Sequence, residues 1–515
     1  MSNATDRPPA SNRTKYMTLL AALLGWMFDG FEMGLFPLIG GPALADLLGP
    51  TAAPADAGKW FGAIIAVFLV GAATGGVLFG WLGDKIGRVR AMSLSIFTYA
   101  IFTGLCGFAT EAWHIAALRF IASLGMGGEW SLGVALVNEV WPGKSRAFIA
   151  GLIGAAANVG FLMVAVLSMG LAGFIGGVEG MLKAIGCSDA TTAKLLANSA
   201  WRFLMISGAF PALLIFFIRL CVPESEKWED EKAKGGTANW ANADLFGVLI
   251  GCGAALGIIW VWSPAAASVS GAVATLITIV GLVVALFGFL HPVRQYLSRA
   301  VAAGSLKPES QKAVVKSMLL GAGLASVALL GTWGSIQWAP RWAAELQKDT
   351  PAMNGAPAVK HYAKEKTQIA TAVGAILATI VAAVAAGRFG RRITYSVMCV
   401  GSIASALWFY NANTTFGTGF LFAAFMAGGI TASFYGFFPL YFPELFPTAV
   451  RATGQGFAFN FGRIVAAIGG LQTATLMKAF DGSFPKAGSV MAAIYVVGIF
   501  IIWLGPETKD QELPE

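Results

Sequence analysis

Long runs of apolar residues recur along the whole chain and constrain its fold more than any other feature. Crossing a hydrocarbon core about 30 Å thick takes about 20 predominantly apolar residues in a helix. Runs of this length extend from 17–39 to 487–505, and only 12% of the 515 residues are charged. A soluble domain carries about 25% charged residues. The chain is therefore predicted to be a membrane protein with many spans, and a soluble enzyme is excluded.

The apolar runs fall into two groups of six, separated by a charge-free insert. The runs lie at about 17–39, 60–82, 91–109, 113–139, 147–173 and 200–221, and then at 318–338, 366–386, 394–411, 416–442, 452–478 and 487–505. Residues 245–290 carry no charge and contain a break at Ser263 and Pro264, so they are long enough for two helices. We therefore predict an all-α membrane protein with fourteen spans. The predicted organisation is a tail at 1–16, a six-helix bundle at 17–222, a linker at 223–317 that holds the two extra helices, a second six-helix bundle at 318–505 and a tail at 506–515.

The basic residues sit mainly in short loops at one end of the apolar runs. The chain has 35 Lys and Arg residues and a net charge of +8. Cytoplasmic loops of membrane proteins carry an excess of Lys and Arg, so both termini are predicted to lie in the cytoplasm and the protein in the cell membrane. This placement explains the charge without nucleic acid as a partner. The five cysteines form no CxxC pair and the three histidines no HxxH spacing, so we expect no metal, no cofactor and no enzymatic activity.

Short motifs repeat between the two groups of runs. After the fourth run the chain reads EVWPGKSR, from Glu139 to Arg146, and after the tenth it reads ELFPTAVR, from Glu444 to Arg451. GDKIGRVR after the second run is echoed by GRFGRR after the eighth, and PES at 223–225 is echoed by PET at 506–508. Parallel repeats of this kind are typical of transporters in which two similar bundles rock against each other.

These motifs, taken in order, resemble the major facilitator superfamily. GWLGDKIGRVRA is similar to the family's loop between spans two and three, and RFIASLGMGGEW to its fourth-helix signature. DGFE at 29–32 and GGEW at 127–130 resemble the metabolite:proton symporters, which include sialic-acid and aromatic-acid carriers. PES, PET and the interval from Arg119 to Glu139 resemble the sugar porters. The resemblance covers about 18–225 and 318–508 but not the insert, and it implies two six-helix bundles, alternating access and usually a monomer.

The resemblance also implies a cytoplasmic gate formed by loop charges at the ends of the two bundles. In the family, such residues form ion pairs that hold the inner side shut while the outer side is open. The alternative is that these charges only set the topology. Gly387 stands where the first half has Asp84, so a symmetric pair of acids is not expected. The expected gate residues are Asp84, Arg88, Glu139, Arg146, Glu224, Arg391, Arg392, Glu444, Arg451 and Glu507.

Ionisable residues inside the apolar runs are costly to bury and are usually functional. Asp29 and Glu32 lie three residues apart on one helix face, and two carboxyl groups this close oppose joint ionisation. Arg119 resembles the fourth-helix arginine that pairs with the first-helix acid in sugar porters. Glu129 lies about 15 Å further along the same helix, so it is a candidate for proton release or for a pair with a basic loop residue. We predict that these four residues couple transport to protons; the alternative is a permanent ion pair that never titrates.

Arg463 lies deep in the eleventh run, about 12 residues from its start. A planar guanidinium binds a carboxylate through two parallel hydrogen bonds, so Arg463 indicates an organic anion as the substrate. The alternative is a pair with Asp29, Glu32 or a backbone carbonyl. Further candidates for the substrate pocket are Asn158, Trp333, Gln337, Tyr435 and Asn460.

The sequence thus predicts a secondary active transporter that couples protons to the movement of a small organic anion, such as a sugar acid or an aromatic carboxylate. One alternative is a neutral-sugar porter in which Arg119 and Arg463 are structural. A remote alternative is a non-transporting sensor built on a transporter fold. The expected partners are the solute, protons and the lipid bilayer.

Overall fold

The computed structural model describes residues 12–50, 54–141, 145–263, 266, 268–348, 360–471, 476–477 and 479–514. This part of the chain is helical and contains no β-strand. Inside a bilayer, backbone N–H and C=O groups have no water to bond, so apolar runs span it as helices that satisfy these groups internally. Twelve helical stretches in the described residues are long and apolar enough to cross a membrane by length and composition.

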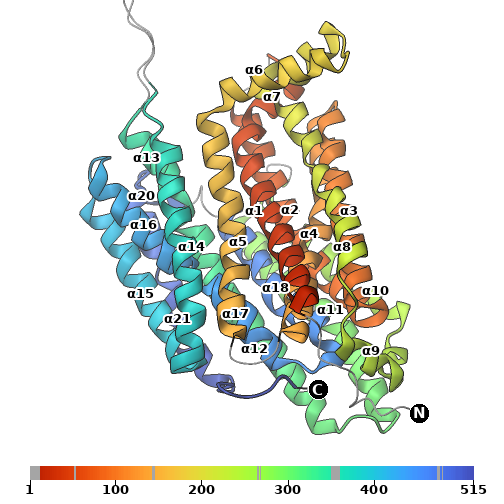
Figure 1. The fold of residues 1–515 in the computed structure, drawn as a ribbon. Helices are drawn as coiled ribbons and strands as arrows, with labels where there is room; N and C mark the ends of the chain where they lie inside the picture. The colour runs from red at the N-terminus through yellow and green to blue at the C-terminus, as the bar shows by residue number, and fades with distance from the viewer. Residues whose placement is uncertain are drawn as a thin grey trace, which may run out of the picture.

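The helices form two halves that stand side by side (Figure 1). The N half, residues 12–222, holds α1 (Asn12–Leu48), α2 (Pro54–Ile86), α3 (Arg88–Leu105), α4 (Ala112–Val140), α5 (Arg146–Met169), α6 (Leu171–Ala184), α7 (Asp189–Ser207) and α8 (Leu214–Cys221). The C half, residues 308–514, holds α12 (Pro308–Gly334), α13 (Ala339–Leu346), α14 (Ala363–Phe389), α15 (Arg391–Ala412), α16 (Thr418–Ala432), α17 (Phe434–Tyr441), α18 (Arg451–Leu471), α20 (Phe484–Met491) and α21 (Ile494–Ile501).

Two seams join the halves: α2 packs against α18, and α5 packs against α14 and α17. Glycine permits the close approach in the first seam, because a Cβ atom on Gly456 of α18 would lie 2.2 Å from the carbonyl oxygen of Gly76 on α2. The same seam carries polar side chains from both halves, which are described below. The halves therefore touch along backbone as well as side chains.

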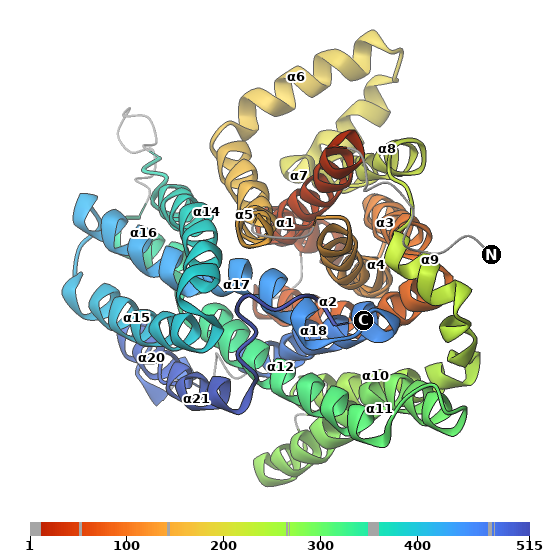
Figure 2. The same cartoon turned by 60° about the horizontal axis from the view of Figure 1, so that its bottom comes forward.

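A linker and a helical hairpin follow α8. The linker contains α9 (Glu226–Ala233), η3 (Gly236–Asn239) and η4 (Asn242–Asp244), and the hairpin consists of α10 (Leu245–Val261) and α11 (Gly271–Ala302). The hairpin lies at the edge of the molecule next to α2, α12 and α18 (Figure 2). Its base is fixed by an ion pair between Arg299 and Asp244 and by the stacked rings of Trp240 and Tyr296, whose centroids are 4.4 Å apart.

Two of the predicted spans are not among the twelve apolar stretches. The one at 200–221 is interrupted by the short helix η2 (Phe210–Leu213) between α7 and α8. The one at 452–478 corresponds to α18, which carries Gln455, Asn460 and Arg463, and its last part falls partly outside the described residues. The total of fourteen spans stays a prediction. The predicted tail at 1–16 also lies mostly outside the described residues.

Different segments of the chain lie at the two ends of the bundle. The lower face, at the bottom of Figure 1, carries the turn between α2 and α3, the start of α18 and the last described residues up to Pro514. The upper face carries α6 and the first part of α7. In α7 the helix is broken at Asn198, Ser199 and Ala200, which have positive φ, and Asp46 of α1 accepts hydrogen bonds from Asn198 and Trp201 beside this break.

Candidate functional site

A cluster of five ionisable side chains is buried inside the bundle, away from both faces. Asp29 and Glu32 come from α1, Arg119 and Glu129 from α4, and Arg463 from α18. Their exposed fractions are 0%, 6%, 3%, 4% and 4%. Four of these residues belong to the N half and Arg463 to the C half, so the cluster draws on both halves of the molecule.

Glu32 and Arg119 form an ion pair within the N half. Arg119 Nη1 lies 2.8 Å from Glu32 Oε1, and the Thr103 hydroxyl donates to the same oxygen at 3.4 Å. The guanidinium lies between the rings of Phe36 and Phe68, each 4.5 Å from it. The charge of Arg119 is therefore balanced by one carboxylate and two aromatic faces. The Glu32 Oε2 atom has no hydrogen-bond partner.

Asp29, one turn away from Glu32, has a different environment. Neither of its carboxyl oxygens is hydrogen-bonded to a cation or to a backbone group, although the side chain is fully buried. It interacts electrostatically with Glu129 of α4, with Arg463 of α18 and with Glu32. The Glu129 carboxyl lies against α1, where a Cβ atom on Gly25 would come within 1.7 Å of Glu129 Oε1. Asp29 and Glu129 thus place two acids beside each other without a hydrogen-bonded cation.

Arg463 approaches this acid pair from the C half. Its guanidinium lies 5.4 Å from the centre of the Phe459 ring, and its Nη1 atom has no hydrogen-bond partner among the described residues. The interaction between Arg463 and Asp29 crosses from one half to the other. Arg463 also interacts electrostatically with Tyr435, which lies next to Thr332 and Trp333.

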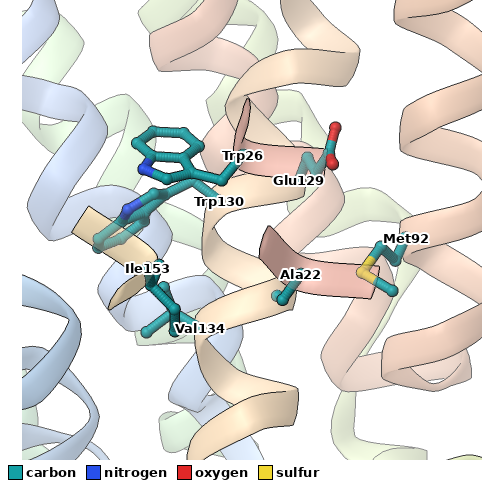
Figure 3. A pocket seen from close by; sticks show the side chains of 8 residues that line it. Ala22, Trp26, Met92, Glu129, Trp130, Val134 and Ile153 are labelled. Atoms are coloured by element: carbon teal, nitrogen blue, oxygen red, sulfur yellow. The ribbon is translucent and has the colours of Figure 1, made fainter. Parts of the chain in front are cut away.

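Aromatic rings close the space beside the charged cluster. Trp130 stacks on Phe459 with ring centroids 3.9 Å apart, and Trp26 lies 6.4 Å from the same Phe459 ring. A cavity of about 10 Å³, room for about one water molecule, lies next to Glu129 on this side. Figure 3 shows Trp26 and Trp130 on one side of the cavity and Glu129 and Met92 on the other. This cavity is too small to hold an organic solute.

Tyr99 of α3 is a member of the site that the sequence did not indicate. Its ring is buried, its hydroxyl has no hydrogen-bond partner, and it interacts electrostatically with Glu129, Asp29 and Glu32. Tyrosine is common at packing positions in membrane helices, so no sequence signal separated Tyr99 from other aromatic residues. The packing of α3 on α4 brings it to the acids.

The residues predicted to bind substrate fall into different places. Trp333 and Tyr435 are partly buried and lie next to each other near Arg463. Asn158 donates to the Gly154 carbonyl of its own helix at 3.1 Å. Asn460 is fully buried in the seam between the halves. Gln337 is exposed in η6 (Ile336–Trp338), beyond the end of α12, so it is not part of the buried cluster.

The predicted gate residues come together at the lower face. Arg88 donates to Asp84 at 2.6 Å and to Glu139 at 3.2 and 3.4 Å, all within the N half. In the C half, Arg391 binds Glu444 through two parallel bonds of 2.9 and 2.6 Å. Each half therefore keeps its own buried glutamate paired with its own arginine.

Two further arginines reach across to the other half. Arg451 of the C half donates to Glu139 at 2.9 Å, and Arg146 of the N half donates to Glu444 at 2.9 Å. The two crossings are related by the motif repeat, Glu139 with Arg146 and Glu444 with Arg451. Together they connect the two halves at the lower face.

The repeated acids of PES and PET cap matching helices. Glu224 accepts hydrogen bonds from the backbone N–H groups of Arg88 and Val89 at the start of α3, at 2.8 and 3.2 Å. Glu507 accepts from Arg391 and Arg392 at the start of α15, at 2.9 and 3.2 Å. The first N–H groups of a helix lack partners within it, so a carboxylate there satisfies them and complements the helix dipole.

Asp84 caps a helix of the opposite half, and no acid stands at the matching position. Its carboxylate accepts from the backbone N–H groups of Ala452 and Thr453 at the start of α18, at 3.2 and 2.8 Å, and from the Thr453 hydroxyl at 2.6 Å. Gly387 occupies the matching site in the C half, where an added Cβ atom would lie 2.9 Å from the Ala147 Cβ atom at the start of α5. The contact of α2 with the start of α18 therefore contains a capping acid that the matching contact of α14 with the start of α5 lacks.

Comparison with known proteins gives the family. The family model described as "Sugar (and other) transporter" matches residues 17–245 and 360–515. The chain belongs to this family, within the major facilitator superfamily. A "putative metabolite transport protein" of Haemophilus influenzae is 26% identical to it over 506 residues, which cover 98% of each chain. A "probable 4-methylmuconolactone transporter" of Cupriavidus pinatubonensis is 26% identical over 96% of this chain and 90% of the relative.

The fold of this sugar (and other) transporter family member is that of a solved symporter. The proton:xylose symporter XylE of E. coli superposes with a TM-score of 0.66 at 17% sequence identity, over 97% of this chain and 98% of the other. The chain is therefore a multi-pass membrane protein with the major facilitator fold, and its relatives are transporters and not enzymes.

Proposed function

We propose that the protein is a symporter that moves a small organic anion together with protons by alternating access. The observation that carries this proposal is the buried cluster in which Asp29 and Arg463 interact from opposite halves, although no cation is hydrogen-bonded to the Asp29 carboxyl group and the Arg463 Nη1 atom has no partner among the described residues. A buried charge without a close partner is unstable unless it is neutralised or bound. A proton neutralises the acid, and a carboxylate completes the bonding of the guanidinium.

The charges of the cluster favour coupled binding. Its three carboxyl groups outnumber its two guanidinium groups, so the fully ionised cluster has one unbalanced negative charge in a site without bulk water. One proton on Asp29 or Glu129 removes that charge. Binding of an anion at Arg463 then adds a negative charge, which a further proton on the acids offsets. Anion and proton binding therefore support each other.

The lower face is the cytoplasmic gate in this proposal. The loops at this face hold most of the Lys and Arg residues, which supports cytoplasmic termini and a place in the cell membrane. The ion pairs of Arg146 and Arg451 then hold the cytoplasmic side shut. Fourteen spans, of which α10 and α11 supply two, leave both ends on the same side, and the working unit is a monomer.

The choice of solute rests on Arg463 and the aromatic rings around it. Tyr435, Trp333 and Phe459 provide apolar surface beside the guanidinium, which suits a compact organic acid. The printed name of the Cupriavidus relative, a probable 4-methylmuconolactone transporter, supports a small organic metabolite.

Uptake into vesicles tests the proposal. The purified protein is first screened by thermal stabilisation at two pH values with benzoate, gluconate, sialic acid and xylose, and the stabilising solutes are then used in uptake assays. We expect uptake of an acid driven by an imposed pH gradient, and loss of this stimulation in Asp29→Asn and Glu32→Gln. Arg463→Gln is expected to weaken binding of the acid at least tenfold, whereas the exposed Lys183→Gln leaves it unchanged.

Other outcomes contradict the proposal in distinct ways. Uptake of xylose that is indifferent to pH and to Arg463→Gln identifies a neutral-sugar porter. Binding of a solute without accumulation in any vesicle preparation identifies a sensor.

A further inference from the structure

Three buried amide side chains cross the boundary between the two halves. Asn138 of α4, Gln455 of α18 and Asn460 of α18 have exposed fractions of 3%, 0% and 0%. Each donates a hydrogen bond from its amide nitrogen to a backbone carbonyl of the opposite half. Along α4, the Ser131 oxygen bonded by Gln455 and the side chain of Asn138 lie between Glu129 of the cluster and Glu139 of the lower face, whereas the Gly127 oxygen bonded by Asn460 lies level with Glu129.

The partner of Asn138 is a carbonyl that its own helix cannot use. Asn138 Nδ2 donates to the Pro439 oxygen of α17 at 3.1 Å. In a helix this oxygen bonds to the N–H group four residues later, but that residue is Pro443, which has no N–H. The Asn138 amide therefore supplies, from the opposite half, the donor that the C half lacks.

The two amides of α18 bond to consecutive turns of α4. Asn460 Nδ2 donates to the Gly127 oxygen at 3.2 Å and to the Gly456 oxygen of its own helix at 2.9 Å. Gln455 Nε2 donates to the Ser131 oxygen. The absence of a side chain at Gly76 makes room for Asn460, because a Cβ atom there would lie 2.1 Å from Asn460 Nδ2.

All three amides are only half satisfied. The side-chain oxygens of Asn138, Gln455 and Asn460 are buried without a hydrogen-bond partner. An unpaired buried carbonyl oxygen loses its bonds to water and gains none in return. Opening of the seam restores these bonds to water, so the same groups that hold the halves together also gain from their separation. Such a balance suits a contact that must break and re-form.

We propose that Asn138, Gln455 and Asn460 are positioning residues that latch the two halves together when the lower face is closed. Each hydrogen bond between the halves joins two uncharged groups, so the latch holds the buried part of the seam together without burying further ions. The latch adds to the ion pairs of Arg146 and Arg451 at the lower face, and both sets of contacts must break for the halves to separate there. This role differs from contact with the solute, which the sequence predicted for Asn460. It rests on the alternating access proposed above, but not on the identity of the solute.

The distance between the halves at the lower face tests the latch without any solute. Spin labels at Arg90 and Arg388, both exposed and in opposite halves, report this distance by pulsed electron paramagnetic resonance after Cys187 and Cys221 are replaced by serine. Loss of one hydrogen bond shifts an equilibrium by about fivefold. We expect Asn460→Leu and Gln455→Leu each to increase the lower-open population relative to the lower-closed one by about that factor.

Matched variants separate the latch from general damage. Asn411→Leu removes an amide whose hydrogen bonds to Leu407 and Ser489 stay within the C half, and it should leave the distance distribution unchanged. Arg146→Gln opens the ionic rim and provides the reference for a lower-open population. Only variants that elute as a single species in detergent are compared.

Each outcome has one reading. If Arg146→Gln shifts the distance distribution but neither Asn460→Leu nor Gln455→Leu does, the latch is wrong and alternating access is unaffected. A shift with Asn411→Leu as large as that with Asn460→Leu also overturns the latch. No lower-open population in any variant, including Arg146→Gln, contradicts the alternating access on which the latch depends.

Discussion

At the scale of single residues, the pair of Glu32 and Arg119 gives the clearest energetic prediction. The guanidinium keeps its charge under all ordinary conditions, so Glu32→Gln leaves it uncompensated in a buried site. Breaking a buried pair in this way costs about 3–5 kcal/mol in the free energy of unfolding. Arg119→Gln is expected to cost less, because the remaining carboxyl group can take up a proton.

The double variant distinguishes the pair from two independent contacts. Glu32→Gln combined with Arg119→Gln removes both charges and is expected to recover more than half of the stability that Glu32→Gln loses. Denaturation in detergent measures all three variants. If the double variant loses as much unfolding free energy as the two single variants together, the ion pair does not account for the stability that they lose.

Gly25 offers a second residue-scale prediction, which concerns the proton path. A Cβ atom at Gly25 meets the Glu129 carboxyl at 1.7 Å, whereas one at Gly41 of the same helix meets nothing within 4 Å. Both replacements improve helix propensity by about 1 kcal/mol. We therefore expect Gly41→Ala to retain proton-driven uptake, and Gly25→Ala to reduce it several-fold because the Glu129 carboxyl must move away from Asp29. Equal uptake by the two variants would remove Glu129 from the coupling site.

At the scale of helices, the motif repeat predicted more of the ion pairs at the lower face than of the buried cluster. The paired EVWPGKSR and ELFPTAVR sequences, and PES with PET, indicated which residues belong together, because equal spacing on repeated bundles places them at equivalent ends. The sequence did not indicate that Glu224 and Glu507 cap α3 and α15, since capping depends on where a helix from another part of the chain begins. It also missed Tyr99 and the cross-half bond of Asn460, because these depend on helix rotation and on close approach at Gly125 and Gly76.

The cap at α15 leads to a prediction about pH. Burial acts to raise the pKa of Glu507, but hydrogen bonds from the backbone N–H groups of Arg391, Arg392 and Lys509 outweigh it, and the net effect lowers the pKa below the ordinary value of 4.5. A carboxylate whose pKa is lowered by folding stabilises the folded chain at every pH above its ordinary pKa. This contribution is lost as the pH falls through the lowered pKa. Glu507→Gln should therefore destabilise the protein by about 1 kcal/mol at neutral pH.

The difference between the two proteins is expected to shrink as the pH falls below about 4.5. Thermal unfolding of both proteins between pH 3.5 and 7, in one detergent, follows this difference. A gap that stays constant over the whole range would mean that the ionised carboxylate of Glu507 does not cap α15.

At the scale of the whole molecule, composition and repeats were enough to predict the fold class. Uncharged runs must become helices in a bilayer, and matching motifs at matching positions indicate two bundles. The number of spans was harder to derive, because α18 carries Gln455, Asn460 and Arg463 inside its length and α7 is broken at Asn198. The same polar residues that weaken α18 as an apolar run place it at the seam, where it meets α2 and α4. The polar residues that α18 uses at the seam are therefore the ones that lower its hydropathy and make it hard to recognise as a span.

The pairing at the lower face allows the two halves to separate while each buried glutamate keeps an arginine of its own half. Glu444, with a side chain 1% exposed, is held by Arg391 of its own half through two bonds and by Arg146 of the other half through one. When the halves part, Arg391 stays with Glu444 and only Arg146 leaves.

Arg146→Gln is therefore expected to change the free energy of unfolding by less than about 1 kcal/mol and to increase exposure of the lower face. Arg391→Gln removes the permanent partner and is expected to cost about 3–5 kcal/mol. Unfolding in detergent, together with the distance between labels at Arg90 and Arg388, separates these effects; equal destabilisation by the two variants would mean that Arg146 is as much a part of the fixed structure as Arg391.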